Sequence, residues 1–257
     1  MKRFLFASDL DNTLLFSAKH DIPRAQCVEY IKGKEQGFFS PTTISLLPEV
    51  NERTLFVPVT TRSIEQYERI QWPIGSQPPF AVTTNGAILL RDGKVDEAWY
   101  ECSCSLVRPY EQTLRDIHNF LLKQNELTSA KIVDGMYVYA CCTDVSSAVA
   151  FAEKHVLSLP LEPVVSGRKV YFFPPGINKG HALERLKDLM LPDTVFCAGD
   201  SLMDVSMLQK ADYAFLPKTL NVSLPCNTKV KCVSEEVLFS DFILHSVLDL
   251  IVQTNKY

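Results

Sequence analysis

The 257-residue sequence has no apolar run long enough to span a bilayer, which excludes a membrane-embedded class. The apolar run after Met1-Lys2-Arg3 covers only Phe4–Ala7, so it is too short for the hydrophobic region of a signal peptide. Basic residues are not in surplus either, because 26 Lys and Arg face 30 Asp and Glu for a formal net charge of −4. This balance disfavours broad nucleic-acid binding. We expect a soluble, cytoplasmic globular protein without a nucleic-acid or membrane partner.

The sequence also lacks the patterns of zinc and disulfide chemistry. Eight cysteines are present, but Cys102 and Cys104, like the adjacent Cys141 and Cys142, are too closely spaced for ordinary bridges. No CxxC pair or nearby histidine completes a zinc pattern, and the five histidines show no ligand spacing. We therefore predict reduced, structural thiols, as in intracellular proteins.

Short apolar runs that end in polar residues mark the predicted strands. They are Phe4–Ala7, Leu55–Val59, Phe80–Val82 and Val195–Ala198. Continuous apolar runs of this length are typical of strands buried on both faces of a parallel sheet. Helical stretches alternate with them, over 43–50, over 63–70 and after Asn178. The alternation predicts an α/β fold, a doubly wound parallel-sheet core with its site at the carboxyl ends of the strands.

One residue conflicts with this pattern. Pro58 lies inside the second apolar run, and a central strand cannot normally lose a backbone donor. Because the neighbouring residues are strongly apolar, we keep the strand and expect a bulge or an unpaired N–H position there.

Residues 86–173 follow a different pattern. Asp92-Gly93 separates two stretches, 88–91 and 95–100, and is a strong hairpin signal. Helices are predicted over 109–127 and 146–157, and strands over 131–140, 161–165 and 169–173. Because this block interrupts the α/β core, it is interpreted as an inserted α+β domain, with 1–85 and 174–257 forming the core.

A second hairpin is predicted near the amino terminus. Residues 28–39 indicate a strand, a turn and a strand, which would form a flap close to the first acidic residues. The sequence leaves open whether this flap contacts a ligand or is a solvated hairpin without function.

Carboxylates follow the first and the last predicted core strand. Asp9 and Asp11 can point the same way once the chain leaves the strand, one as a nucleophile and one as a proton carrier. A short helix from about residue 201 would turn Asp200 and Asp204 toward one pocket. So much negative charge requires a cation, and Mg²⁺ fits because it prefers oxygen ligands and a substrate phosphate.

Hydroxyl and basic side chains lie at other predicted element ends. Thr60, Thr61 and Arg62 close the second strand with groups that suit phosphate oxygens. Lys179 falls in a first helical turn, where a cation opposes the helix dipole and needs an anionic partner. Taken singly, Thr60-Thr61-Arg62 is equally explained as a helix cap with a surface arginine, and Lys179 as an exposed lysine that the helix tolerates at small cost. Together with the acids they indicate a magnesium-dependent phosphoryl-transfer site.

These motifs, in this order, resemble those of the haloacid dehalogenase superfamily in its phosphatase branch. The resemblance is carried by Asp9-Leu10-Asp11-Asn12-Thr13, Thr60-Thr61-Arg62, Asn178-Lys179-Gly180 and Gly199-Asp200-Ser201-Leu202-Met203-Asp204. The insertion resembles the type II cap. Residues 173–180 are similar to the segment that re-enters the core in the Cof-like and sucrose-phosphatase-like group, and Thr84-Asn85-Gly86-Ala87 is similar to its core-to-cap crossing. The sequence departs from relatives at Asn12 and Thr61, where many have glycine, and in the flap.

The resemblance implies a hydrolase of phosphomonoesters. Asp9 would attack phosphorus to form an aspartyl-phosphate, and Asp11 would protonate the leaving alcohol and then activate water. Thr60 and Lys179 would hold the phosphoryl oxygens. Other residues that would contact substrate are Thr61, Arg62 and Asn85. The cap would select the substrate, a small phosphorylated metabolite such as a sugar or polyol phosphate.

The resemblance also implies the metal site. Mg²⁺ would be held by Asp9, Asp200 and the main-chain carbonyl of Asp11. Asp204 would orient these ligands without binding the metal directly. Two alternatives stay open: a sugar phosphomutase, and a slow or non-catalytic regulatory protein that binds a phosphorylated ligand. The intact acids argue against the latter. The physiological substrate and the oligomeric state are left open.

Overall fold

The computed structural model describes residues 3–234 and 236–254, which fall into two compact units. The first unit contains the chain up to Val95 and from Lys179 onward, and the second is Asp96–Asn178. The second unit is therefore an insertion in the first.

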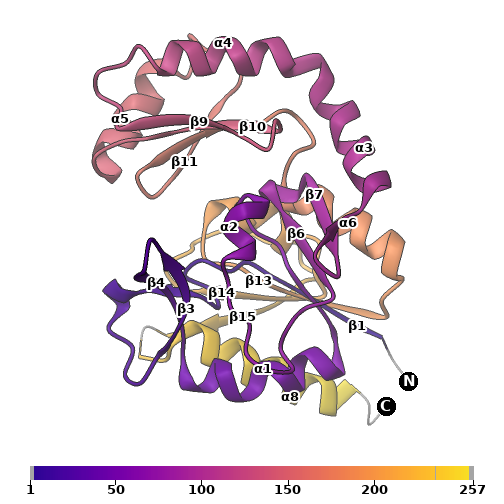
Figure 1. Cartoon of the computed structure of the whole chain (residues 1–257). Helices are drawn as coiled ribbons and strands as arrows, with labels where there is room; N and C mark the ends of the chain where they lie inside the picture. Colours follow the sequence, from indigo (N-terminus) through magenta and orange to yellow (C-terminus); the bar gives the residue numbers. More distant parts are fainter. Residues whose placement is uncertain (1–2, 235, 255–257) are drawn as a thin grey trace. The chain divides into compact units, whose positions relative to one another are not determined.

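A five-stranded parallel sheet forms the centre of the first unit, in the order β15-β14-β13-β1-β5 (Figure 1). Its strands are β1 (Phe4–Ser8), β5 (Leu55–Pro58), β13 (Thr194–Ala198), β14 (Tyr213–Pro217) and β15 (Lys229–Val233). All five residues of β1 are buried, as expected for a strand covered on both faces. Because β1 lies between β5 and β13, the residues that follow these three strands are neighbours at one edge of the sheet.

Two helices cover one face of this sheet. α1 (Pro41–Arg53) and α8 (Phe239–Thr254) pack against each other and lie side by side below the sheet in Figure 1. Alternate residues of β1, Phe4 and Phe6, join the apolar cluster on this face, together with residues of both helices. α6 (Lys179–Met190) packs on α7 (Val205–Leu208), which contacts β13 and β14. Figure 1 shows α6 on the other side of the sheet from α1 and α8.

Two small antiparallel sheets complete the first unit. The predicted flap forms as a hairpin and belongs to a sheet in the order β2-β4-β3, with β2 (Phe16–Ser17), β3 (Gln26–Ile31) and β4 (Lys34–Phe39). The other sheet has β6 (Phe80–Thr83), β7 (Ile88–Arg91) and β8 (Lys94–Val95), preceded by α2 (Ile64–Glu68). Short 3₁₀ helices of the chain are η1 (Ala18–His20), η2 (Thr84–Gly86), η3 (Arg108–Tyr110) and η4 (Leu202–Asp204).

The second unit is an antiparallel sheet with helices. Its strand order is β11-β12-β10-β9, with β9 (Ser129–Val133), β10 (Tyr137–Cys141), β11 (Pro163–Ser166) and β12 (Lys169–Phe172). α3 (Glu97–Val107) leads into α4 (Glu111–Leu121), which contacts β9 and β10, whereas α5 (Val145–His155) contacts β11 and β12. The predicted fold class, an α/β parallel-sheet core with an inserted α+β unit, is confirmed.

The boundaries of the insertion differ from those predicted. The hairpin at Asp92-Gly93 forms, but β7 pairs with β6, so residues 88–95 belong to the first unit. The division falls at 95/96 and 178/179 instead of 85/86 and 173/174. The strand predicted over 95–100 is wrong beyond Val95, because the Asp96 side chain accepts a hydrogen bond from the Trp99 N–H at 2.8 Å and starts α3.

Two further predicted elements are shorter than expected. The helix predicted over 109–127 is the 3₁₀ turn η3 followed by α4, which ends at Leu121. The single strand predicted over 131–140 is two strands, because Asp134 and Gly135 adopt positive φ values of 47° and 74° and turn the chain back.

Pro58 is accommodated by its place in the sheet. β5 is the edge strand of the five-stranded sheet, and its register with β1 runs without interruption from Leu55 to Pro58. Of the two expected outcomes, a bulge or an unpaired N–H position, the bulge is therefore absent from this pairing. β6 continues the sheet beyond β5 only through one bridge, Val59 to Val82. An edge position tolerates the missing N–H of proline.

Two predictions concern the whole chain. None of the helices formed by the described residues combines the length and hydrophobicity that crossing a bilayer requires. All eight cysteines are unpaired; Cys141, Cys142 and Cys197 are buried, whereas Cys102, Cys226 and Cys232 are exposed.

Candidate active site

The polar residues predicted at strand ends come together in the first unit. Asp9 follows β1, Thr60 follows β5 and Asp200 follows β13. Backbone hydrogen bonds hold these ends in register: the Asp9 N–H donates to the Ala198 carbonyl at 2.9 Å. The parallel order of the strands thus places residues from both ends of the chain in one site.

Lys179 is the central cation of this site. Only 1% of the residue is exposed, and its Nζ lies 2.6 Å from Asp9 Oδ1 and 2.6 Å from Asp204 Oδ1. Burial lowers the pKa of Lys179, but the carboxylates of Asp204 and Asp9 outweigh this effect, so that its pKa is raised. The lysine is therefore charged, and it has the anionic partners that its position at the start of α6 requires.

Three carboxylates surround this single cation. Asp9, Asp200 and Asp204 each offer an oxygen within 4.8 Å of the others. Burial raises the pKa of Asp9 well above its usual range, Lys179 acts in the opposite direction, and the neighbouring acids add to the rise. Burial, with Asp204, also raises the pKa of Asp200 to about 6. A hard divalent cation fits this group, because all donors are carboxylate oxygens and the cluster carries more negative than positive charge.

Asp204 is held by its own motif. Its Oδ2 accepts hydrogen bonds from the backbone N–H and the hydroxyl of Ser201, at 3.0 and 2.9 Å. A Cβ on Gly199 would lie 2.3 Å from the Asp204 Cβ, which is far inside any real contact. A residue without a side chain is therefore required at position 199, because the Asp204 side chain fills that space.

Asn12 is one of the departures from the pattern of relatives. It adopts a left-handed φ of 58°, a conformation that glycine and asparagine tolerate best. The Asn12 side chain lowers the pKa of Asp200, a smaller effect than the rise caused by burial. Asparagine thus meets the backbone requirement at this position and also favours the ionised form of a candidate metal ligand.

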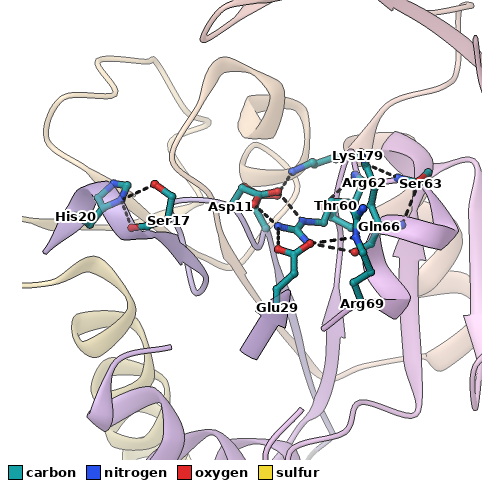
Figure 2. Close-up of polar contacts among 11 residues, drawn as sticks. Asp11, Ser17, His20, Glu29, Thr60, Arg62, Ser63, Gln66, Arg69 and Lys179 are labelled. Carbon is teal, nitrogen blue, oxygen red and sulfur yellow. Dashed lines mark hydrogen bonds and ion pairs between the residues drawn. The ribbon is translucent and has the colours of Figure 1, made fainter. Parts of the chain in front are cut away.

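Asp11 contacts Arg62 (Figure 2), whereas Asp9 and Asp204 contact Lys179. The Asp11 carboxylate accepts two hydrogen bonds from Arg62, from Nε at 2.9 Å and from Nη2 at 2.8 Å. The same Nη2 lies 3.0 Å from Glu29 Oε2, and Glu29 Oε1 lies 3.3 Å from Arg69 Nε. The Asp11 side chain is 49% exposed, whereas that of Glu29 is 4% exposed. The side chain of Asp11, the predicted proton carrier, is therefore partly exposed to solvent, while Arg62 holds it in place.

Glu29 was not predicted as a site residue. It lies in the flap, where a charged residue next to apolar ones is ordinarily solvent-facing, and a bulge around it changes which way its side chain points. The sequence offers one weak signal, a glycine at position 37 on the facing strand. That signal cannot be interpreted before the pairing of the two strands is known.

The remaining predicted residues form the loop beside Asp11. Thr60 is fully buried, and its hydroxyl oxygen accepts a hydrogen bond from the Arg62 N–H at 3.1 Å. The Asn85 N–H donates to the Thr60 carbonyl at 3.0 Å, and the Thr84 N–H to the Arg62 carbonyl at 2.7 Å. Thr61 is partly exposed. The loops after β5 and β6 are thus joined, and Thr60 and Asn85 lie on one side of the site.

Comparisons with known proteins identify the fold. No family model matches the sequence, and no curated protein matches it. Several solved structures are similar over nearly their whole length. The sucrose-phosphatase from Synechocystis sp. PCC6803, in complex with sucrose and phosphate, is 14% identical with a TM-score of 0.63, covering 97% of this chain and 98% of that one.

Two further structures agree. The C-terminal domain of trehalose-6-phosphate phosphatase from C. albicans is 15% identical with a TM-score of 0.60, covering 98% of this chain and 92% of that one. A haloacid dehalogenase-like hydrolase from B. subtilis is 16% identical with a TM-score of 0.59, covering 97% of this chain and all of the other. Identities this low establish the fold alone. The expected haloacid dehalogenase-like fold, an α/β core with an inserted unit, is confirmed.

Proposed function

We propose that this protein is a Mg²⁺-dependent phosphomonoester hydrolase that acts on a small phosphorylated metabolite of the sugar or polyol phosphate class. The observation that carries the proposal is the buried Lys179, hydrogen-bonded to both Asp9 and Asp204 beside Asp200. The fold supports it, since similar structures include a sucrose-phosphatase and a trehalose-6-phosphate phosphatase.

The proposed reaction has two steps that use Asp9 and Asp11. In the first, a carboxylate oxygen of Asp9 attacks phosphorus, the bond from phosphorus to the leaving oxygen breaks, and the Asp11 carboxyl group gives its proton to that oxygen. In the second, water attacks the phosphorus of the aspartyl-phosphate while the Asp11 carboxylate takes a proton from the water. The bond from phosphorus to Asp9 then breaks, inorganic phosphate leaves, and Asp11 is protonated again.

The other residues hold and balance charge. Lys179 and the Thr60 hydroxyl would bind phosphoryl oxygens, and the contacts of Lys179 with Asp9 and Asp204 fix its position for this task. Asp9, Asp200 and the Asp11 carbonyl would hold Mg²⁺, and Asp204 would orient these ligands without binding the metal directly. When bound, the metal supplies the positive charge that three carboxylates and a phosphate together require.

Substrate choice is assigned to the inserted unit, Asp96–Asn178. In proteins with an inserted domain, the inserted residues vary independently of the reacting groups and can adapt the site to different leaving groups. Thr61 and Asn85 are proposed as additional contacts to the substrate from the first unit. Arg62, whose guanidinium already contacts Asp11, Glu29 and the Gln66 carbonyl, is proposed to hold Asp11 instead.

A panel of phosphorylated sugars and polyols tests the function. Release of inorganic phosphate with Mg²⁺, and its loss in excess EDTA, would support the hydrolase. Formation of an isomeric sugar phosphate without free phosphate would support the alternative phosphomutase. Binding without turnover would support the alternative regulatory protein.

A further inference from the structure

The flap is fastened to the loop after β5 by a buried carboxylate. Glu29 of β3 is 3% exposed and lies between two guanidinium groups, those of Arg62 and Arg69 (Figure 2). A backbone hydrogen bond from the Gln71 N–H to the Val28 carbonyl, 2.7 Å long, fixes the adjacent residue of the same strand. The flap is thus anchored to the first unit at the point where Glu29 points inward.

The local structure is arranged to bury this one side chain. The pairing of β3 with β4 shifts register on both sides of Glu29, so that Val28 and Glu29 are buried in succession instead of alternating. Gly37 lies opposite Glu29, and a Cβ there would be 2.9 Å from Glu29 Oε2 and 3.1 Å from its Cβ. A solvated hairpin needs neither the bulge nor the glycine.

Arg62 joins Glu29 to the proposed proton carrier. Its Nη2 donates to both Glu29 and Asp11, and its Nε donates to Asp11, so the guanidinium plane is fixed by two carboxylates. Its Nη1 donates to the Gln66 carbonyl at 3.2 Å, which uses the remaining edge. With every edge occupied, the guanidinium cannot turn without losing contacts to at least one partner.

We propose that Glu29 is a positioning residue: through Arg62 it orients the Asp11 carboxyl group for proton transfer to the leaving oxygen. The inference rests on the proposed function and assigns a role to the flap in that reaction. Glu29 does not touch the reacting atoms. It acts by holding Arg62, and Arg62 holds a side chain that is otherwise half exposed.

The proposal predicts a dependence on the leaving group. p-Nitrophenyl phosphate loses a stable anion that needs little protonation. Phenyl phosphate is nearly the same size, but its leaving group is phenolate. This anion is more basic, because its conjugate acid has a pKa of about 10, and it therefore depends more on protonation. A variant in which Asp11 is misoriented should therefore lose much more activity on phenyl phosphate than on p-nitrophenyl phosphate. General damage to the fold would lower both rates alike.

The test is Glu29→Gln, with Glu35→Gln as the matched control on the same hairpin, because Glu35 is exposed on β4. For Glu29→Gln we expect kcat/KM to fall at least about tenfold more for phenyl phosphate than for p-nitrophenyl phosphate. Glu35→Gln should leave the ratio unchanged. Equal losses on both substrates, or no loss on either, would overturn the proposal.

A second variant keeps the charge and moves the carboxylate. Gly37→Ala pushes against Glu29 without removing it, and should change the ratio in the same direction by a smaller factor. The sugar and polyol phosphate panel, not these aryl phosphates, decides the proposed function. If the protein hydrolyses neither aryl phosphate, the link between Glu29 and Asp11 can still be measured by urea unfolding. Non-additive unfolding free energies of Glu29→Gln and Asp11→Asn would support it, and additive ones would overturn it.

Discussion

Lys179 and Asp9 are 170 residues apart in the sequence, and their side chains meet at 2.6 Å in the buried centre of the site. The same ammonium group lies 2.6 Å from Asp204, so a single cation connects the first and the last acidic motif. When one member of a buried ion pair is removed, the charge of the other stays buried without a partner. The free energy lost in this way is larger than the net stability that the intact pair contributes. The stability of the metal-free protein and the proposed chemistry therefore depend on the same contact.

Lys179→Met should destabilise the protein by about 3–5 kcal/mol in the absence of divalent cations, because Asp9 and Asp204 lose their common partner. Added Mg²⁺ should recover part of this loss, since a cation can compensate the same carboxylates. Urea unfolding with and without Mg²⁺ measures both effects. Lys187→Met, on the same helix, is the control and should cost only about 1 kcal/mol, because it loses one hydrogen bond, to the Lys210 carbonyl at 3.3 Å. A Lys179→Met protein as stable as the parent in EDTA would contradict the assigned contacts.

Metal-free protein should become more stable as the pH falls from about 7 to about 5. The pKa of Asp200 is raised from 3.8 to about 6 by burial and by Asp204, so the folded state binds this proton more tightly than the unfolded chain does. The destabilisation of the folded state by ionised Asp200 is fully present above about pH 6. It disappears as the pH falls toward 3.8, the pKa of Asp200 in the unfolded chain. For Asp200 alone it is on the order of 1–3 kcal/mol.

Asp200→Asn is the variant that isolates this effect. In EDTA it should be more stable than the parent near neutral pH, and its stability should vary less between about pH 5 and 7. Thermal unfolding across this range measures the difference. An unchanged pH dependence would show that Asp200 is not the group responsible.

Gly199→Ala should be strongly destabilising, because the new Cβ would overlap the Asp204 side chain at 2.3 Å. A loss of about 3 kcal/mol or more is expected if the strand end cannot shift. Gly93→Ala serves as the control, since nothing lies within 4 Å of its added Cβ and only its φ of 74° is unfavourable, at a cost of about 1–2 kcal/mol. Equal losses in the two variants would argue against close packing of Asp204.

The arrangement of the core could be predicted because its evidence is local. The apolar runs before Asp9, Thr60 and Asp200 are long enough to be identified as buried strands, and parallel strands bring their following residues to one edge. Lys179 could be inferred to need an anionic partner from its helical position alone. The structure supplies those partners, Asp9 and Asp204.

The elements that could not be predicted depend on single side chains or on pairing. Asp96 ends a hairpin by capping α3, although the residues after it suit a strand equally well. Asp134-Gly135, which splits one predicted strand into two, is an exception, because it is the same turn signal as Asp92-Gly93 and could have been predicted. Glu29 becomes buried because β3 has a bulge. A bulge changes which face of the sheet the following side chains point to, and composition does not show this. For Asp96 and Glu29, the local sequence pattern is overridden by a contact that only the folded chain shows.

The proposal that Asp9 is a phosphorylated nucleophile can be tested directly by mass spectrometry of the quenched reaction. Asp11→Asn is mixed with p-nitrophenyl phosphate and Mg²⁺, because loss of the proton acceptor should slow the second step more than the first. After acid quenching, the account predicts one phosphoryl group on the peptide that contains Asp9, and none in the variant that also carries Asp9→Asn. Phosphate release by the parent protein with the label on another residue, or with no labelled peptide in Asp11→Asn, would contradict it.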